Sequence, residues 1–291
     1  MTGAARSYGA LTITNALPTG IGCAVGIELP VDARVSLSTQ GPRKAPTLRV
    51  AAGQRTRLVE LSLRAGLSTY FPETNAVATL SLRSKVPVRR GLKSSSAVST
   101  AILRATARAA GTEPSSLELG RLSAEVSRRA GVSATGALDD ALAGLTPGFV
   151  VTDNLLGEVL RRSEVDPSWA ALLYIPSRPH PPSPRLRTAF SKEHRAGELS
   201  VRAALEGDWA RAMELNSELV ERTMGYSYRD IRHRLLSHGA LASGVSGLGP
   251  TLATIAPRAQ LDELASLLPS DRAEKRLVPF VRGNGSRGAG P

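Results

Sequence analysis

Residues 87–97 read Pro-Val-Arg-Arg-Gly-Leu-Lys-Ser-Ser-Ser-Ala, and an apolar helical run continues to Leu103 without a break. A helix that begins within the three serines has unpaired amide N–H groups at the positive end of its dipole, with hydroxyls beside them. Such a helix N-terminus is a natural site for phosphate. The functional interpretation places phosphates against the amides of residues 91–95 and leaves a serine hydroxyl for Mg²⁺.

The alternative is an ordinary helix start, in which one serine caps the helix after a proline–glycine turn. One serine is enough for a cap, and capping gives no reason for Ser94, Ser95 and Ser96 together. The phosphate interpretation is therefore favoured. The stretch is not a Walker A motif, because that motif requires a Gly-Lys pair and this chain contains none.

Length and composition are those of a globular protein. The chain has 291 residues, of which 42% are hydrophobic and 21% charged, so it can bury a core of one large domain or two of ordinary size. Aromatic residues make up only 4%. We therefore expect a core of small and branched aliphatic side chains, and the composition excludes a disordered chain.

The net charge is +12, from 37 Lys and Arg against 25 Asp and Glu, which raises the possibility of nucleic-acid binding. The arginines are scattered, however, in pairs such as Arg89-Arg90, Arg128-Arg129 and Arg161-Arg162, with no basic run of five. Few aromatic residues lie between them to stack on bases. A preference for small anionic ligands explains the charge at least as well, so no nucleic acid is expected as a partner.

The only cysteine is Cys23, which excludes an intramolecular disulfide and a metal site made of cysteines alone. We see no signal peptide and no stretch of about 20 apolar residues that could span a bilayer. The chain is expected to be cytoplasmic, with no membrane partner.

Strands and helices alternate irregularly along the chain, which favours an α+β fold with mixed sheets and packed helices in two lobes. The expected strands are residues 7–15, 24–29, 33–38, 76–88, 148–152, 158–162, 170–175, 251–255 and 275–281, and the expected helices are residues 94–110, 117–130, 195–206, 208–223, 229–237 and 258–268. Residues 283–291 form a glycine-rich tail that we expect to be disordered.

A second group of polar residues spans residues 131–140, Gly-Val-Ser-Ala-Thr-Gly-Ala-Leu-Asp-Asp. Asp139 or Asp140 could orient or deprotonate a hydroxyl. Adjacent helical residues point about 100° apart, so at most one of the two is expected to face a site. The alternative is that both stabilise a helix N-terminus. Glu125, on the preceding helix, is a candidate metal ligand, and its alternative is a solvated charge.

A third stretch, residues 244–250, reads Gly-Val-Ser-Gly-Leu-Gly-Pro, and its glycines allow close backbone approach and positive φ. It is not a serine-hydrolase elbow, because Leu248 stands where that motif requires glycine. Alone this loop is weak evidence, but it gains weight beside the first loop.

Together the three stretches resemble the GHMP kinase superfamily. Residues 87–97 are similar to its phosphate-binding signature Pro-x-x-x-Gly-Leu-Gly-Ser-Ser-Ala, and residues 244–249 to its C-terminal glycine-rich motif. Within the superfamily the chain resembles the archaeal-type shikimate kinases. The resemblance to that branch rests on Lys93 in place of glycine, on Thr-Ile-Thr-Asn-Ala-Leu-Pro-Thr-Gly at residues 12–20, on residues 131–140 and on Val-Thr-Asp-Asn at residues 151–154.

The resemblance spans residues 5 to about 282. It implies an N-terminal GHMP kinase domain over residues 1–152 with the phosphate loop, and a C-terminal one over residues 153–282. It also implies phosphoryl transfer from ATP, with Mg²⁺, to the 3-hydroxyl of shikimate. The implied site residues are Pro87, Arg90, Gly91, Leu92, Lys93, Ser94, Ser95, Ser96, Ala97, Gly247 and Gly249 for ATP; Ser95 and Glu125 for Mg²⁺; Asp139 or Asp140 for the attacking hydroxyl; and Asn15, Thr19 and Gly136 for the substrate.

Two other functions remain open from the sequence. One is a GHMP kinase for another small alcohol such as homoserine or mevalonate. The other, from a different class, is a basic nucleic-acid-binding protein that uses residues 94–96 only to begin a helix.

Overall fold

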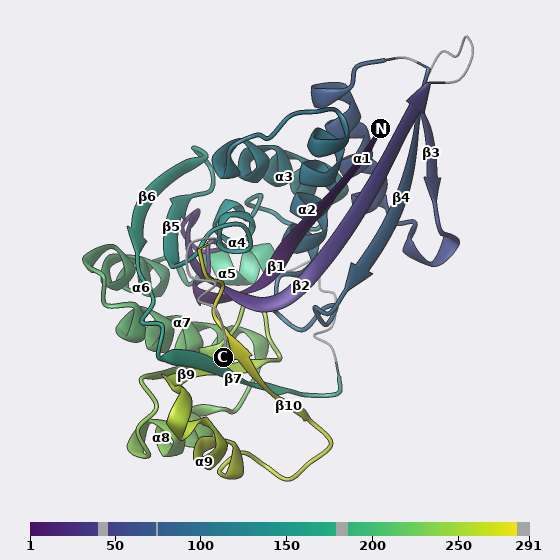
Figure 1. Ribbon diagram of the computed structural model, residues 1–291. Coiled ribbons are helices and arrows are strands. Elements are labelled where there is room, and N and C mark those ends of the chain that lie inside the picture. The colour runs from purple at the N-terminus through teal and green to yellow at the C-terminus, as the bar shows by residue number, and fades with distance from the viewer. Residues whose placement is uncertain (40–45, 74, 179–185, 284–291) are drawn as a thin grey trace.

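The computed structural model describes residues 1–39, 46–73, 75–178 and 186–283, and within them the chain forms two β-sheets with helices packed on both (Figure 1). The first sheet has the order β3-β4-β2-β5-β6, and β1 pairs with β2 beside that path. Its strands are β1 (Thr2–Thr14), β2 (Ile21–Thr39), β3 (Thr47–Val50), β4 (Ala76–Ser84), β5 (Phe149–Asp153) and β6 (Glu158–Ser163). Strands β3 and β4 are parallel, and the other neighbours in this sheet are antiparallel.

The second sheet is antiparallel, with the order β10-β7-β9-β8. Its strands are β7 (Trp169–Ile175), β8 (Ala242–Val245), β9 (Leu252–Pro257) and β10 (Glu274–Pro279). The α+β class predicted from the sequence is confirmed. Strand β6 lies beyond residue 152 but belongs to the first sheet, and the chain passes from one sheet to the other between Ser163 and Trp169. The boundary at residues 152 and 153 stays a prediction.

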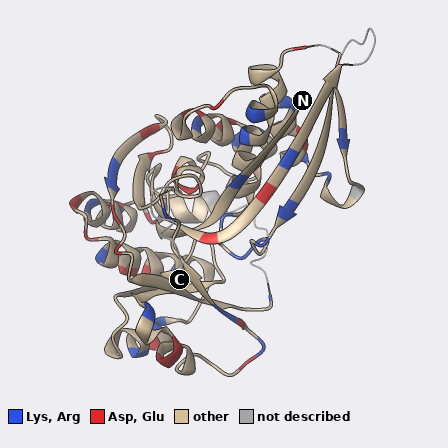
Figure 2. Cartoon of the chain, in the orientation of Figure 1, with Lys and Arg blue, Asp and Glu red and all other residues tan. Residues whose placement is uncertain are grey.

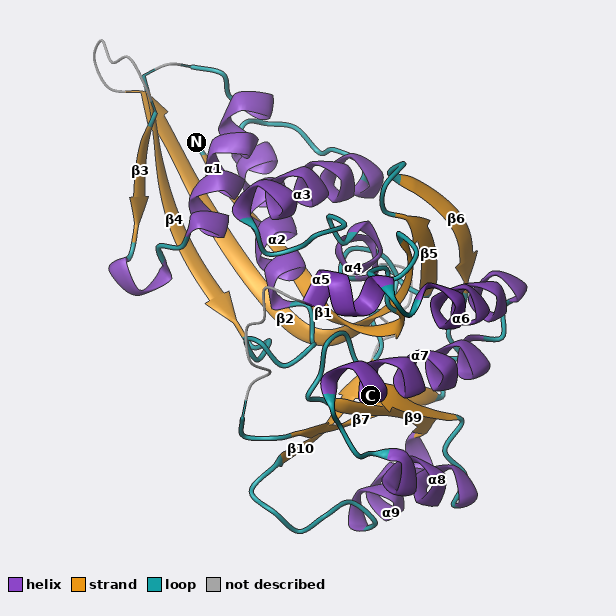
Figure 3. Cartoon of the chain, turned by 180° about the vertical axis from the view of Figure 1, so that it is seen from behind, coloured by secondary structure: helices purple, strands orange, loops and turns teal. Residues whose placement is uncertain are grey.

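Helices of the first half of the chain pack on the first sheet, whereas in the second half α7 contacts both sheets and α6 contacts β1 and β2 of the first (Figure 3). The helices of the first half are α1 (Arg57–Tyr70), α2 (Ser94–Ala109), α3 (Ser116–Ala130) and α4 (Leu138–Ala143), together with the 3₁₀ turn η1 (Ala52–Gln54). Those of the second half are α5 (Leu186–Ser191), α6 (His194–Glu206), α7 (Trp209–Met224), α8 (Arg229–Ser237) and α9 (Leu261–Ser266), together with the 3₁₀ turn η2 (Arg258–Gln260).

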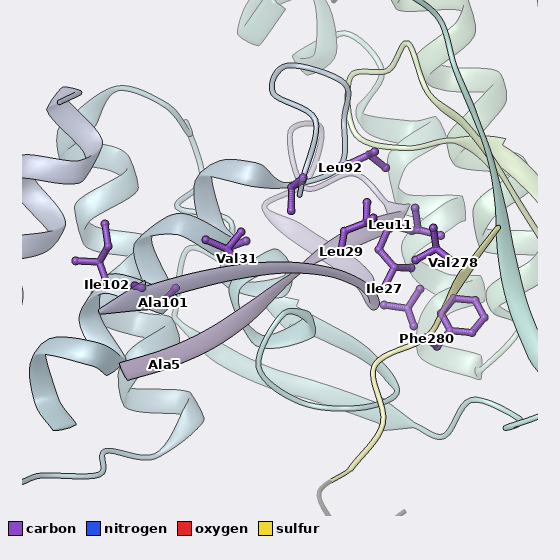
Figure 4. Packing of buried hydrophobic residues seen from close by; sticks show 14 of the residues in the cluster. Ala5, Leu11, Ile27, Leu29, Val31, Leu92, Ala101, Ile102, Val278 and Phe280 are labelled. Atoms are coloured by element: carbon purple, nitrogen blue, oxygen red, sulfur yellow. The ribbon is translucent and has the colours of Figure 1, made fainter. Parts of the chain in front are cut away.

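One apolar core joins the two sheets. Leu11 and Ile27 of the first sheet belong to the same buried cluster as Val278 and Phe280 near the C-terminal end (Figure 4). Successive side chains of strand β7 point to opposite faces of the sheet, and both faces of this strand are buried. Leu173 points into this shared core, whereas Leu172 packs with α8 and α9 on the far side. The two lobes are therefore packed against each other through apolar contacts.

Three expectations need correction or addition. Residues 24–29 and 33–38 are not separate strands, because β2 runs through Pro30 from Ile21 to Thr39. Pro30 lies at a register shift between β1 and β2, where its missing N–H breaks no ladder, and its carbonyl accepts a hydrogen bond from the amide of Lys85. The elements expected above also lack α1, α4, α5, β3 and β8.

Most other elements agree with the sequence interpretation to within a few residues, including α2, α3, α6, α7 and α8. Residues 284–291 of the expected tail lie outside the described residues. Lys and Arg are spread over both sheets and their helices, with Asp and Glu among them (Figure 2). In the described part of the chain, no helix combines the length and apolar character needed to cross a bilayer.

Candidate active site

A cavity of about 830 Å³ lies where four segments meet. They are the phosphate loop (residues 87–97), α4, the end of α3 and the second glycine loop (residues 244–250). Residues far apart in the sequence, such as Thr12, Asp140 and Gly247, line it together. Ten of the predicted site residues are among those lining it: Asn15, Gly91, Leu92, Lys93, Ser94, Ser95, Ser96, Asp139, Asp140 and Gly247.

Helix α2 enters the cavity without a side-chain cap. Its N-cap residue is Lys93, held in the left-handed region at φ 64°, and no side chain of the described residues caps the helix. Ser94, Ser95 and Ser96 are already helical. The alternative of an ordinary serine cap is therefore wrong. The amides of the first turn have no carbonyl partner inside the helix, so they are available to an anion.

The second glycine loop is bonded directly to the phosphate loop. The Ser246 hydroxyl donates to the carbonyl of Gly91 at 2.8 Å and accepts from the amide of Thr12 at 3.1 Å. A Cβ on Gly91 would lie 2.0 Å from the carbonyl oxygen of Ser246, and Gly91 has φ +80°. Only glycine fits this contact. The close backbone approach predicted for residues 244–250 is confirmed.

Asp139 is fixed by contacts with Asn154 and Gly22. Its Oδ1 accepts from the Asn154 amide at 2.9 Å, and its own N–H donates to Asn154 Oδ1 at 3.2 Å. Asn154 Oδ1 also accepts from the Thr152 hydroxyl at 2.7 Å. The other carboxylate oxygen lies over Gly22, where a Cβ would be 2.3 Å away. Burial raises the pKa of Asp139.

Asp140 instead faces a cation and the cavity. Its Oδ2 lies 3.2 Å from Nζ of Lys93, and among the described residues its Oδ1 has no hydrogen-bond partner. Burial, and then the like charge of Asp139, raise the pKa of Asp140 to about 7, while Lys93 works in the opposite direction. A carboxylate with a pKa near neutrality is suited to accept a proton.

Both residues line the cavity, but only Asp140 has a carboxylate oxygen without a partner among the described residues, so the expectation that at most one carboxylate faces the site stays a prediction. They lie in the first turn of the short helix α4, after Ala137 at φ 58°. This position also agrees with the alternative, since both acids lie at the positive end of a helix. Their surroundings separate them: Asp139 is bonded to Asn154, and Asp140 is paired with Lys93.

Several predicted residues lie outside the cavity lining. Pro87 and Arg90 line a neighbouring hollow, where Arg90 donates to the carbonyl of Ser177. Ala97 is buried in α2, Gly249 packs on Tyr226, Thr19 bonds to the backbone of Ile21, and Gly136 packs on Arg128.

The two predicted metal ligands are not brought together. Ser95 lines the cavity, but Glu125 is on the outer face of α3, where its side chain is 56% exposed and lies 3.6 Å from Arg129. Within the described residues, no group of three or more His, Cys, Asp or Glu could hold a metal ion.

The sequence interpretation gave no role to Asn154 or Ser246. Asn154 is a polar residue directly after a strand that ends beside the two carboxylates, and this position is a usable signal. Ser246 stands just before Gly247, in a loop whose sequence signal comes from its glycines alone. Its hydroxyl is what joins that loop to Gly91.

The chain matches two family descriptions. Residues 58–148 match "GHMP kinases N terminal domain", and residues 200–271 match "GHMP kinases C terminal".

Curated relatives cover nearly the whole chain. It is 33% identical over 285 residues to a shikimate kinase of Methanosarcina mazei, which covers 95% of this chain and 92% of the relative. It is 35% identical over 250 residues to a shikimate kinase of Thermococcus kodakarensis, covering 85% and 90%.

Solved structures show the same fold at lower identity. A mevalonate kinase of Methanococcus jannaschii superposes with a TM-score of 0.69 at 13% identity, covering 97% of this chain and 98% of the other. A homoserine kinase of Cytophaga hutchinsonii gives a TM-score of 0.67 at 16% identity, covering 96% and 95%. These matches support the fold described above and no more.

Proposed function

Because the chain belongs to the GHMP kinase family, with archaeal shikimate kinases as relatives over most of its length, we propose that it phosphorylates the 3-hydroxyl of shikimate with ATP. The products are shikimate 3-phosphate and ADP. The observation that carries this proposal is the meeting of an uncapped helix N-terminus and a lysine-paired carboxylate in one cavity. Since the reaction consumes ATP, we also propose a cytoplasmic location.

The phosphate loop fits the phosphates of ATP. The amides of Ser94, Ser95 and Ser96 have no partner within the helix, and the helix dipole adds a positive potential at the same end. The glycine at position 91 keeps the loop clear of Ser246. ATP, when bound, supplies the phosphoryl group, and this chain provides the donors that hold it in place.

For Mg²⁺ the fit is limited to one side chain. Ser95 offers a hydroxyl oxygen in the cavity, whereas Glu125 lies outside it. Magnesium in kinase sites is held largely by phosphates and water with few protein ligands, so Ser95 is sufficient as the protein contribution. The ion would neutralise phosphate charge. No step of the reaction is assigned to Glu125.

Asp140 is the proposed acceptor of the substrate's proton. Asp140 lines the cavity and its Oδ1 has no partner among the described residues, so a substrate hydroxyl that donates to it would be oriented for attack. Lys93 lowers the pKa of Asp140, which favours its ionised form, and adds a positive charge beside the phosphates. Asp139 and Asn154 act as positioning residues, because their mutual bonds fix the start of α4.

An assay of ADP release with shikimate, homoserine and mevalonate tests the proposal. Turnover with shikimate alone is the expected result, and turnover that requires one of the other alcohols would contradict it. Asp140→Asn should lower kcat with shikimate by about 10²–10⁴. Asp153→Asn is a matched control, since the side chain of Asp153 bonds only to the local amides of residues 155 and 156 among the contacts described.

The nucleic-acid alternative has no support from the comparisons. It requires oligonucleotide binding that weakens steeply with salt in a protein without kinase activity.

A further inference from the structure

Three residues that line the same cavity each carry a buried polar atom without a protein partner. The atoms are Oγ1 of Thr12 on β1, Oγ of Ser127 on α3 and Oδ1 of Asp140 on α4. Thr12 and Ser127 are each 1% exposed and Asp140 is 6% exposed. None of the three atoms has a hydrogen-bond partner in the part of the chain that the structure describes.

Such atoms are costly in a folded protein. A buried polar atom left without a partner costs about 1–3 kcal/mol, so native proteins satisfy most of them. Neighbouring hydroxyls follow that rule: Thr14 bonds to Ser200 at 2.8 Å, and Thr152 bonds to Asn154 at 2.7 Å. The hydroxyls of Ser123 and Thr251 are also unpartnered but do not line the cavity, so position sets Thr12 and Ser127 apart, because a ligand in the cavity could complete them.

The chemistry of the three atoms defines the ligand. Two hydroxyls can each donate or accept, and one carboxylate oxygen can only accept. They come from three different elements around one cavity, so a single ligand must offer polar groups in three directions. A compact ring with several hydroxyl groups meets this requirement, and an alcohol with one hydroxyl does not.

We propose that Thr12 and Ser127 bind the two non-reacting hydroxyls of a polyhydroxylated substrate and so present its third hydroxyl to Asp140. This inference rests on the proposed function, and it deepens that function by naming the side chains that select the substrate. Three contacts fix both the position and the rotation of a ring, whereas Asp140 alone would leave the ring free to turn.

The test uses Thr12→Val and Ser127→Ala, which remove one hydroxyl each and change little else. We expect kcat/KM for shikimate to fall roughly tenfold in each variant, as the loss of one neutral hydrogen bond implies, while KM for ATP stays within about twofold. Shikimate analogues that lack one non-reacting hydroxyl identify each pair. Each variant should lose its preference for shikimate over one of the two deoxy analogues and keep the other preference.

Two matched controls separate binding from folding. Ser123→Ala removes another unpartnered buried hydroxyl of α3, one turn before Ser127, but Ser123 does not line the cavity. Thr14→Val removes a hydroxyl of β1 that is bonded to Ser200. Neither control should change the discrimination between shikimate and its deoxy analogues. Thr12→Ser keeps the hydroxyl and should restore the discrimination lost in Thr12→Val.

The outcomes distinguish this inference from the proposed function. A wild-type protein that does not phosphorylate shikimate overturns the proposed function. A wild-type protein active on shikimate, whose two variants discriminate among the analogues as the wild type does, overturns the inference alone.

Discussion

Nζ of Lys93 lies 3.2 Å from Oδ2 of Asp140, and this ion pair joins the residue that begins α2 to the first turn of α4. Both side chains line the cavity. The lysine stands where the family signature has glycine, and its backbone adopts φ 64°, a conformation that glycine adopts without strain. A lysine here carries backbone strain that glycine would avoid, but it places a cation beside the carboxylate of Asp140.

Replacing Lys93 by glutamine should move the pH dependence of the reaction. Lys93 lowers the pKa of Asp140, whereas burial and Asp139 raise it. Without the ammonium, the pKa of Asp140 should therefore rise above about 7. The midpoint of the kcat/KM profile should therefore move to higher pH, and Lys93→Arg should restore it in part. An unchanged midpoint in Lys93→Gln would show that Asp140 does not titrate in the profile.

The wild-type protein should show opposite trends of activity and stability with pH. If Asp140 accepts a proton, kcat/KM rises as the pH passes through about 7. The free energy of unfolding should fall between about pH 4 and about pH 7, because the folded chain keeps a proton that the unfolded chain has lost. Urea titrations across this range should show a shallower decline in Asp140→Asn, and an equal decline in both proteins would contradict the assignment.

Gly91→Ala should separate the two glycine loops. The added Cβ would lie 2.0 Å from the carbonyl of Ser246 in addition to the strain of φ +80°, so KM for ATP should rise at least tenfold. Gly111→Ala is the matched control, because Gly111 has φ +82° with no atom within 4 Å of the added Cβ among the described residues. The control should lose about 1 kcal/mol of stability and keep normal kinetics. Equal KM values for ATP in the two variants would show that the second glycine loop does not contribute to ATP binding.

Ser95→Ala should lower kcat by about 10²–10³ with little change in the melting temperature, since the hydroxyl is the proposed protein ligand of Mg²⁺. Ser115→Ala provides the contrast. Ser115 caps α3 in a capping box with Glu118, so its loss should cost about 1 kcal/mol of stability and leave kcat unchanged. Near-normal turnover of Ser95→Ala at saturating Mg²⁺ would exclude the role in metal binding.

Local signals were sufficient to predict the elements that carry the phosphate loop. The turn, the three serines and the apolar run are contiguous, and they predict helix α2 and the residue at which it begins correctly. Helix α1 lacks such a signal, because Gly66 interrupts it and serine and threonine follow. The structure supplies the reason for that glycine: a Cβ at Gly66 would lie 3.0 Å from Thr106 of α2, so the helices approach closely there.

Contacts between distant segments could not be predicted in the same way. The residue types of α3 do not reveal that Ser127 faces the cavity while Glu125 faces solvent, since helix rotation is set by packing. Likewise, nothing near Thr12 in the sequence indicates that Ser246 will lie against its amide. The roles of Asp139 and Asp140 separate only when Asn154 and Lys93 are seen beside them.

The hydroxyl of Ser246, which bonds to both Thr12 and Gly91, has a consequence for how the protein is made. The ribosome produces the phosphate loop first. Ser246, which fixes the backbone of Gly91, follows 155 residues later in the sequence. A nascent chain can therefore form α2 and still lack a finished nucleotide pocket. The ability to capture ATP should appear only after residue 246 has been added, and a premature stop before residue 246 should yield a chain without it.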